Sequence, residues 1–183
     1  MPLLGPEEAL PRGFIPGEYR IAVAAQPWER AGCFALRRQV FCTEQRIFAG
    51  DDRDEVDAAC TMLAAYSCLF GHADQVVGTV RIHAPEPGLW WGSRLAVARP
   101  YRRIGGLGAA LIRLAVGTAR AKGARMFLAH VQVQNRALFE AMDWQVLDQK
   151  TIHGQPHLLM QADLAAYAPI ADGALRVLPQ VAA

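Results

Sequence analysis

The stretch that decides the fold is Arg94–Leu114, which reads RLAVARPYRRIGGLGAALIRL. Its apolar beginning belongs to a predicted strand, Leu89–Ala98, and a basic turn follows at Arg99–Arg103. Its end opens a predicted helix, Gly106–Lys122, with another glycine directly after the last residue, as is common past a helix C-terminus. The stretch therefore predicts a strand, a glycine-rich loop and a helix in immediate succession.

The loop carries three glycines in four positions, Gly105, Gly106 and Gly108. The amides of a first helical turn have no intrahelical acceptor, and the helix dipole is positive at that end. Glycines let a bulky anion approach the backbone closely, and the neighbouring arginines add positive charge. The loop is therefore predicted to bind a phosphate group.

Three nucleotide-binding patterns compete for this loop. A Walker loop needs Lys and Ser or Thr after its last glycine, but Ala109 and Ala110 follow here. A Rossmann fingerprint needs a third glycine where Leu111 stands, and a run of alternating strands and helices is also missing. The remaining pattern is Arg-x-x-Gly-x-Gly, which begins at Arg103.

The order of predicted elements indicates one α/β (α+β) domain over residues 19–164, with an arm at 1–18 and a tail at 165–183. Consecutive strands in the first half favour an antiparallel meander, and the helix-linked strands that follow favour one parallel crossover. We expect a mixed, mostly antiparallel sheet of about seven strands flanked by helices. The predicted strands are Tyr19–Ala25, Cys60–Phe70, Gln75–His83, Leu89–Ala98, Arg125–Val131, Trp144–Gln149 and His157–Asp163, and the predicted helices are Trp28–Gln45, Gly106–Lys122 and Asn135–Met142.

Composition narrows the class of protein. The chain has 183 residues, of which 52% are hydrophobic and 20% are charged, with a formal net charge of +2. These values fit a globular domain, and the small net charge together with the lack of interleaved aromatics argues against nucleic-acid binding. The four cysteines form no C-x-x-C pair, so we expect free thiols and no metal site. No stretch resembles a leader or a membrane span, so we expect a cytoplasmic protein without a membrane partner.

An acidic loop, residues 46–57 (RIFAGDDRDEVD), carries five Asp or Glu residues. One interpretation is a solvated connector, and the other is a wall of the substrate site that attracts a cation. The spacing and the lack of a closing glutamate do not support an EF-hand.

At this point the chain resembles the GNAT family of acyl-CoA N-acyltransferases. The loop, the strand SRLAV (Ser93–Val97), the late helix and strand ALFEAMDW (Ala137–Trp144) and the hairpin GQPHLLM (Gly154–Met160) carry the resemblance over roughly residues 19–164. VFCTEQRIF (Val40–Phe48) is similar to one bacterial branch. FCTEQ, WWGSRLAV and HVQVQN resemble the group linked to nitrile and cyanide assimilation gene clusters, in which some relatives continue into an AIR synthase-like domain. The resemblance implies the GNAT fold, with splayed fourth and fifth strands.

The resemblance also implies a cofactor site for acetyl-CoA. Backbone amides of Arg103–Ala109 would bind the pyrophosphate, with charge from Arg102 and Arg103. The backbone of Leu95–Val97 would hold the pantetheine arm, and the amide of Val97 would hold the thioester oxygen. The full predicted set is Leu95, Ala96, Val97, Arg102, Arg103, Ile104, Gly105, Gly106, Leu107, Gly108, Ala109, Asn135 and Phe139.

The catalytic half is less well defined by the sequence. A proton acceptor is needed because an alkyl amine has a pKa near ~10. Glu44 is the first candidate, followed by Asp57 and His83, and His130 could contact the acyl end; a purely structural role is open for each. Trp90 and Trp91 are adjacent on a strand and face opposite sides, so one, here taken as Trp91, could wall the acceptor pocket.

Two positions depart from the family pattern. Phe139 stands where many members have a tyrosine that acts as general acid, and Asp143 stands where glycine is usual. The expected function is an acetyl-CoA-dependent N-acetyltransferase that acts on a small amine, with a cationic acceptor mildly favoured by the acidic loop. The alternative is a non-catalytic sensor or scaffold that binds CoA. A homodimer and a functional link to an AIR synthase-like protein are further options.

Overall fold

The structure, a computed structural model, describes residues 16–178. Residues 1–15 of the predicted arm and 179–183 of the predicted tail lie outside this range. The strands are β1 (Tyr19–Val23), β2 (Thr61–Leu69), β3 (His72–Glu86), β4 (Leu89–Val97), β5 (Met126–Gln132), β6 (Trp144–Ile152), β7 (Gln155–Ala162) and β8 (Leu175–Val177), and the helices are α1 (Pro27–Arg37), α2 (Leu107–Ala121) and α3 (Arg136–Glu140).

The strands form a single eight-stranded sheet in the order β6-β7-β5-β4-β3-β2-β1-β8. All neighbouring pairs are antiparallel except β4 and β5, which are parallel and joined by α2. The predicted mixed, mostly antiparallel sheet is thereby confirmed. One strand more than the seven expected is present, because β8 arises from the segment predicted to be a tail.

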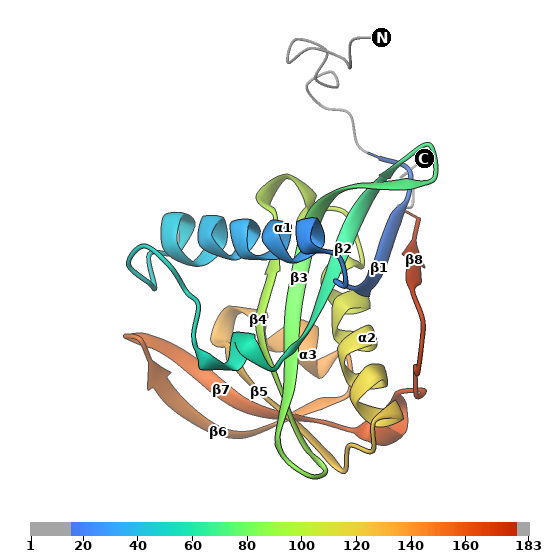
Figure 1. Ribbon diagram of the computed structural model, residues 1–183. Helices are drawn as coiled ribbons and strands as arrows, with labels where there is room; N and C mark the ends of the chain where they lie inside the picture. Colours follow the sequence, from blue (N-terminus) through green and yellow to red (C-terminus); the bar gives the residue numbers. More distant parts are fainter. Residues whose placement is uncertain (1–15, 179–183) are drawn as a thin grey trace, which may run out of the picture.

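Helices α1 and α2 cover opposite faces of this sheet. Alternate residues of a strand point to opposite faces. On β2, Leu63 and Ala65 belong to the core cluster under α2, whereas Met62 and Ala64 pack with Cys33 of α1. Figure 1 shows α1 crossing the strands near one end of the sheet. The two cores are thus separated by the sheet, and each helix buries one set of β2 side chains.

The first helix begins at Pro27, as predicted from the preference of proline for a first turn. It does not stay α-helical to its end, because Arg38–Glu44 forms wider, π-helical turns in which Gln45 N donates to Val40 O over 2.9 Å. Val40 and Phe41 from these turns pack with Ala96 of β4. The end of this helix is therefore fixed directly over β4.

β4 and β5 pair only at their beginnings, where Leu89–Gly92 lies beside Met126–Ala129. Both strands continue for several residues without pairing with each other, which confirms the predicted splay. A bulge lies at this point of β4: Val80 on β3 faces two β4 residues, Arg94 and Leu95, because Arg81 pairs with Ser93 while Thr79 pairs with Ala96. Arg94 has a φ of 56°, which is costly for a residue with a long side chain.

The segment after β7 is fastened to the domain, so the expectation of a loosely attached tail is wrong for the described residues. The Tyr167 hydroxyl is buried, donates to Met142 O and accepts from Trp144 Nε1 at 3.0 Å. Ile170 N donates to Gly117 O over 2.9 Å, and an added Cβ at Gly117 would meet Ile170 at 2.7 Å. This close approach lets the chain cross α2 and return to the sheet as β8.

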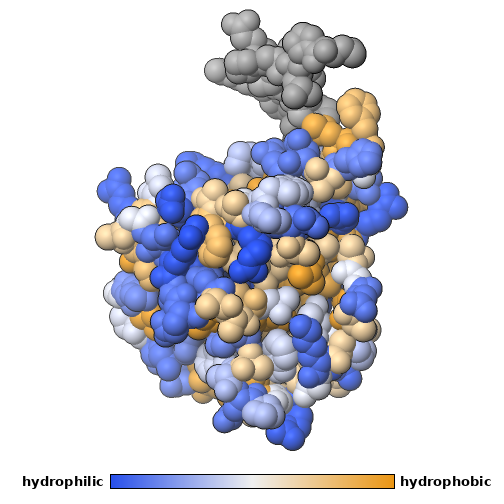
Figure 2. Space-filling view, viewed as in Figure 1, coloured by the Kyte–Doolittle hydropathy of each residue, from blue (hydrophilic) through white to orange (hydrophobic). Residues whose placement is uncertain are grey.

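The face of the molecule seen in Figure 1 is mostly hydrophilic, and its apolar side chains are scattered (Figure 2). None of the described helices is long and apolar enough to cross a membrane. Most large apolar side chains lie in the buried clusters on the two faces of the sheet.

We expect Tyr167→Phe to lower the free energy of unfolding by about 1–3 kcal/mol, because it leaves a buried donor and a buried acceptor unpaired. Urea denaturation followed by fluorescence measures this loss. Tyr101→Phe is the matched control, since its hydroxyl pairs with the exposed Gln75 side chain, and it should change stability by no more than about 0.5 kcal/mol. Equal losses in the two variants would contradict the proposed fastening.

Candidate functional site

A cavity of about 1010 Å³ opens where β4 and β5 separate. Its walls come from both strands, from the glycine loop and the start of α2, from the end of the first helix and from the β6–β7 hairpin. Twelve of the thirteen predicted cofactor residues line it: Leu95, Ala96, Val97, Arg102, Ile104, Gly105, Gly106, Leu107, Gly108, Ala109, Asn135 and Phe139. Arg103 is exposed and does not line it.

The glycine loop ends in a helix start without a side-chain cap. Gly106 is the N-cap of α2, with a φ of 95°, and its carbonyl accepts the first helical bond from Ala110 N at 2.8 Å. Only glycine adopts this φ at little cost. Because no side chain caps α2, the amides of its first turn remain available to an anion, and the 15-residue helix adds its dipole. These residues therefore fit a diphosphate.

The edge of β4 that faces the gap presents backbone groups as well. Ala98 N donates to Val77 O of β3 over 2.8 Å, so by strand alternation Ala96 also directs its backbone groups to β3. Leu95 and Val97 then direct theirs into the gap. The Val97 carbonyl accepts a hydrogen bond from Arg102 Nε at 2.8 Å, and by the same alternation its amide faces the gap.

The opposite end of the cavity is lined by aromatic and imidazole side chains. His130 of β5 lies 5.1 Å from Trp91 of β4, measured between ring centroids. His153, at the turn of the β6–β7 hairpin, lies 4.7 Å from Phe48, so the hairpin touches the acidic loop across this end. His83 also lines the cavity, and its buried Nδ1 has no hydrogen-bond partner among the described residues.

Both histidines predicted at the site have environments that disfavour the charged form. Burial, and then the neighbouring Lys150 and His157, lower the pKa of His130 below its usual value. Burial and the adjacent Arg81 lower the pKa of His83, and Asp54 offsets this only in part. Both imidazoles are therefore neutral at physiological pH and able to accept a proton.

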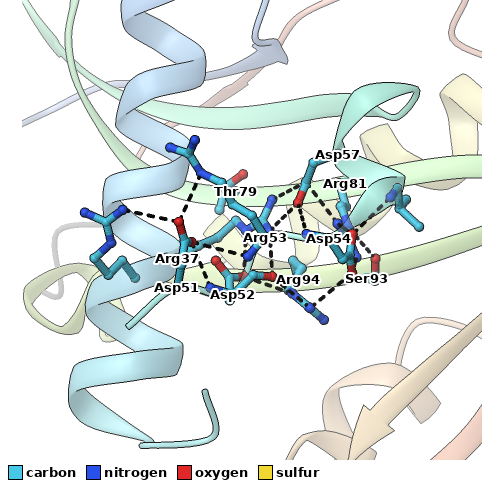
Figure 3. Close-up of polar contacts among 12 residues, drawn as sticks. Arg37, Asp51, Asp52, Arg53, Asp54, Asp57, Thr79, Arg81, Ser93 and Arg94 are labelled. Atoms are coloured by element: carbon cyan, nitrogen blue, oxygen red, sulfur yellow. Dashed lines mark hydrogen bonds and ion pairs between the residues drawn. The ribbon is translucent and has the colours of Figure 1, made fainter. Parts of the chain in front are cut away.

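The acidic loop is held to the sheet by a network of ion pairs, which we call the Arg–Asp network. Figure 3 shows arginines from α1, β3 and β4 converging on the carboxylates of this loop. Its members are Arg37, Asp52, Asp54, Asp57, Arg81 and Arg94, with N···O distances between 2.5 and 3.3 Å. Ser93 Oγ also accepts from Arg81 Nε at 2.9 Å.

The charges of this network compensate one another. Burial alone would raise the pKa of Asp57, but hydrogen bonds from Arg37 and Arg81 outweigh it and hold that pKa well below its usual range. Hydrogen bonding and charge from Arg81 likewise lower the pKa of Asp54. Three aspartates thus face three arginines, so the formal charges of the network balance.

The structure departs from both interpretations of the acidic loop. It is not a solvated connector, because Asp52 and Asp57 are buried. Nor does it give the cavity negative charge, because none of the described lining residues is Asp or Glu. The carboxylates of this loop therefore give no support to a cationic acceptor.

Two residues predicted at the catalytic end lie elsewhere. Asp57 belongs to the Arg–Asp network and does not line the cavity. Glu44 accepts from Arg102 Nη2 at 2.6 Å and is also absent from the lining. His83, Trp91 and His130 do line it. The predicted aromatic and imidazole residues therefore lie at the cavity, and the two predicted carboxylates do not.

Some lining residues were missed by sequence reasoning. Phe48, His153 and His157 line the acceptor end, and the last two belong to the β6–β7 hairpin. Two histidines within five residues of a hairpin, with one at its turn, are a usable signal for a site wall. Within residues 16–178, no group of three or more His, Cys, Asp or Glu residues is arranged to hold a metal ion.

Comparison with known proteins defines the class. The chain matches the model of the acetyltransferase (GNAT) family over residues 33–144, more than half of its length. The chain therefore belongs to the GNAT acetyltransferase family. It is 29% identical over 136 residues to the uncharacterized protein YyaT of Bacillus subtilis (strain 168), which covers 71% of this chain and 86% of that protein.

Solved structures show the same fold. A Lactobacillus plantarum protein has a TM-score of 0.70 at 24% identity and covers 80% of this chain and 98% of its own. Escherichia coli ElaA has a TM-score of 0.66 at 16% identity, with 79% and 98% covered. An aminoglycoside 6′-N-acetyltransferase complexed with coenzyme A has a TM-score of 0.64 at 12% identity, with 79% and 96% covered.

We expect Asp57→Asn to destabilise the protein by about 3–5 kcal/mol, because it leaves one positive charge of the buried network uncompensated, although Arg37 keeps Asp52 and Arg81 keeps Asp54. The lowered pKa of Asp57 means that its contribution is present above the unfolded pKa of about 4 and is lost as the pH falls below it. The variant should therefore also show a shallower loss of stability between about pH 5 and pH 3. Denaturant unfolding across this pH range measures both effects.

Asp51→Asn is the matched control, since this carboxylate of the same loop pairs only with exposed arginines. Its effect should stay within about 1 kcal/mol. A loss as large as that of Asp57→Asn would show that loop charge in general, rather than the buried pairing, stabilises the fold.

Proposed function

We propose that the protein transfers an acetyl group from acetyl-CoA to the primary amine of a small molecule. The observation that carries this proposal is the continuity of one cavity from the uncapped start of α2, along the unpaired edge of β4, to the imidazoles at the other end. A diphosphate, an extended amide-containing arm and a reacting amine each have matching groups along this path.

The direction of the chain assigns the backbone donors. The glycine loop follows directly after β4, so Val97 is the gap-facing residue nearer to the diphosphate, and Leu95 is nearer to Trp91 and His130. Pantetheine would therefore bond to Val97, and the thioester oxygen would be held by the Leu95 amide, the role predicted from the sequence for Val97.

His130 is the proposed proton acceptor. It lies at the start of the splay, lines the cavity and is neutral at physiological pH, whereas Glu44 is tied to Arg102 outside the lining. The amine nitrogen forms a bond to the thioester carbon, the carbon–sulfur bond breaks, and one N–H proton passes to the imidazole. His83 is a second base candidate on the neighbouring strand.

The leaving group needs no acid from the protein. Phe139 cannot donate a proton; its ring is buried against Trp144 with centroids 5.0 Å apart. A thiol with a pKa of about 8.5 departs as thiolate near neutral pH. Burial of Phe139 is therefore compatible with turnover, with water as the final proton source.

We expect Gly106→Val to abolish detectable CoA binding in isothermal titration, because a side chain would block the amides and strain the positive φ. Gly123→Val is the matched control, as Gly123 has a φ of 87° beyond the other end of the same helix and lies outside the cavity. It should lose comparable stability and keep CoA binding. Retained binding in Gly106→Val would refute the proposed diphosphate site.

We expect His130→Gln to lower kcat by about 100-fold or more, because the amine loses its proton acceptor. The wild-type rate should fall with acid only at a pH below the ordinary histidine pKa of about 6.5, since the pKa of His130 is lowered, and the variant should lose this limb. Thiol release from acetyl-CoA measures both, with the exposed His72→Gln as control. If His130→Gln kept the wild-type pH profile, His130 would not be the proton acceptor, and His83 or water would have that role instead.

A sensor or scaffold would bind CoA in the same cavity without releasing thiol. Thiol release across a broad amine panel separates it from a transferase once CoA binding is established. The cytoplasmic location, the homodimer and the links to nitrile-type gene clusters and to an AIR synthase-like protein stay predictions of the sequence.

A further inference from the structure

Among the residues that the structure describes, the cavity is lined by positively charged side chains and by no carboxylate, which is unusual for a site that receives an amine. The charged residues that line the cavity as a whole are three arginines, Arg81, Arg94 and Arg102. No described lining residue is acidic, and the carboxylates nearby are occupied by the Arg–Asp network. A polycationic acceptor would therefore meet no anionic partner there and would face positive charge instead.

The three arginines differ in their remaining hydrogen-bonding capacity. Arg81 is only 4% exposed and donates to Asp54, Asp57 and Ser93. Arg102 is tied to Glu44 and to the Val97 carbonyl at the cofactor end. Arg94 alone combines a partly exposed side chain, at 18%, with a position at the acceptor end.

The guanidinium of Arg94 is fixed on one side and open on the other. Nε donates to Asp52 Oδ2 at 2.9 Å, and Nη2 donates to Asp52 O at 3.0 Å and Asp54 Oδ2 at 3.3 Å. Nη1 donates to none of the residues that the structure describes, and Figure 3 shows Arg94 at the edge of the network. Phe48 packs under the guanidinium, with its ring centroid at 4.6 Å. Arg94 is thus held in place with an unused pair of donors.

The surrounding walls include flat aromatic and imidazole rings. Phe48 and His153 form one aromatic pair, and Trp91 and His130 form another, at centroid distances of 4.7 and 5.1 Å. Such walls favour an aromatic ring, which stacks or packs edge-on against them. Since a carboxylate is the group that a guanidinium recognises best, the two features together define a ligand with a flat body and an anionic end.

From this juxtaposition we propose that the acceptor is an amine that carries an aromatic ring and a carboxylate; Arg94 Nη1 binds the carboxylate while the ring lies between Trp91 and Phe48. The inference rests on the proposed transferase function and names the substrate class for it. The carboxylate anchors the acceptor to the bulge of β4, and the amine is thereby directed toward His130.

The test compares matched amines in the thiol-release assay with acetyl-CoA: phenylalanine, tryptophan and 4-aminobenzoate, each against its carboxamide, together with spermidine. The expected result is that at least one acid exceeds its carboxamide at least about tenfold in kcat/KM, because a charged hydrogen bond is lost in the amide. Spermidine should be the poorer substrate. Equal rates for every acid and its carboxamide, or a preference for spermidine, would overturn the inference.

Variants at Arg94 make the test specific. Arg94→Gln should bring the acid-to-carboxamide ratio to within about threefold, mainly through a higher KM for the acid, and Arg94→Lys should restore part of it. Arg53→Gln removes an exposed arginine of the same loop that does not line the cavity, and it should keep the wild-type ratio. CoA affinity by titration confirms that each variant is folded. A ratio unchanged in Arg94→Gln would contradict the role of Arg94.

A binding measurement distinguishes failure of the transferase proposal from failure of the ligand-class proposal. Ligand-observed NMR measures whether the same acids bind to the protein loaded with CoA. If no amine is acetylated but an aromatic acid binds and Arg94→Gln abolishes its binding, the transferase proposal fails and the ligand class stands. If amines are acetylated without regard to their carboxylate, the transferase proposal stands and the ligand class fails.

Discussion

The interaction on which the rest of the structure depends is the buried pairing of three arginines with three aspartates beneath the acidic loop. Removing these charges from water costs several kcal/mol for each ion, and the cost is offset only because every charge has an opposite partner at hydrogen-bond distance. Arg37 comes from α1, Arg81 from β3 and Arg94 from β4, so the pairing with loop carboxylates joins three elements that are distant in sequence. Each of the three arginines contacts two of the aspartates, so loss of one carboxylate would leave an excess positive charge in the network.

This network also shapes the site. Arg94 lies in the bulge of β4 with a left-handed backbone conformation, which is held by the two aspartates that its side chain contacts. The bulge lies next to the last residues at which β4 pairs with β5, and beyond it the edge of β4 is free. The same constraint therefore fixes the acceptor end and opens the edge that suits an extended cofactor arm. The acceptor end and the cofactor end of the cavity therefore meet at the bulge of β4.

Much of the fold could be predicted from the sequence, and the reasons are local. The glycine at position 106 needs a positive φ and opens α2, and the short turn between the apolar runs of β2 and β3 predicts their hairpin. The cofactor residues could be predicted because they are consecutive in the chain: loop, helix start and preceding strand. The catalytic end could not, because its residues come from α1, β3, β4, β5 and the β6–β7 hairpin. Glu44 and Asp57 seemed suited to proton transfer, but arginines far away in sequence bind both of them.

The order of elements, the glycine loop and the resemblance to the GNAT family could be read from the chain alone, since they follow from local propensity and from spacing along it. Only the tertiary structure decided that the acidic loop is neutralised, that the cavity lining lacks carboxylates, and that the end of the described chain returns to the sheet as β8. The physical reason is the same in each case. The charge and accessibility of a side chain depend on the partners that packing brings to it, and those partners lie tens of residues away.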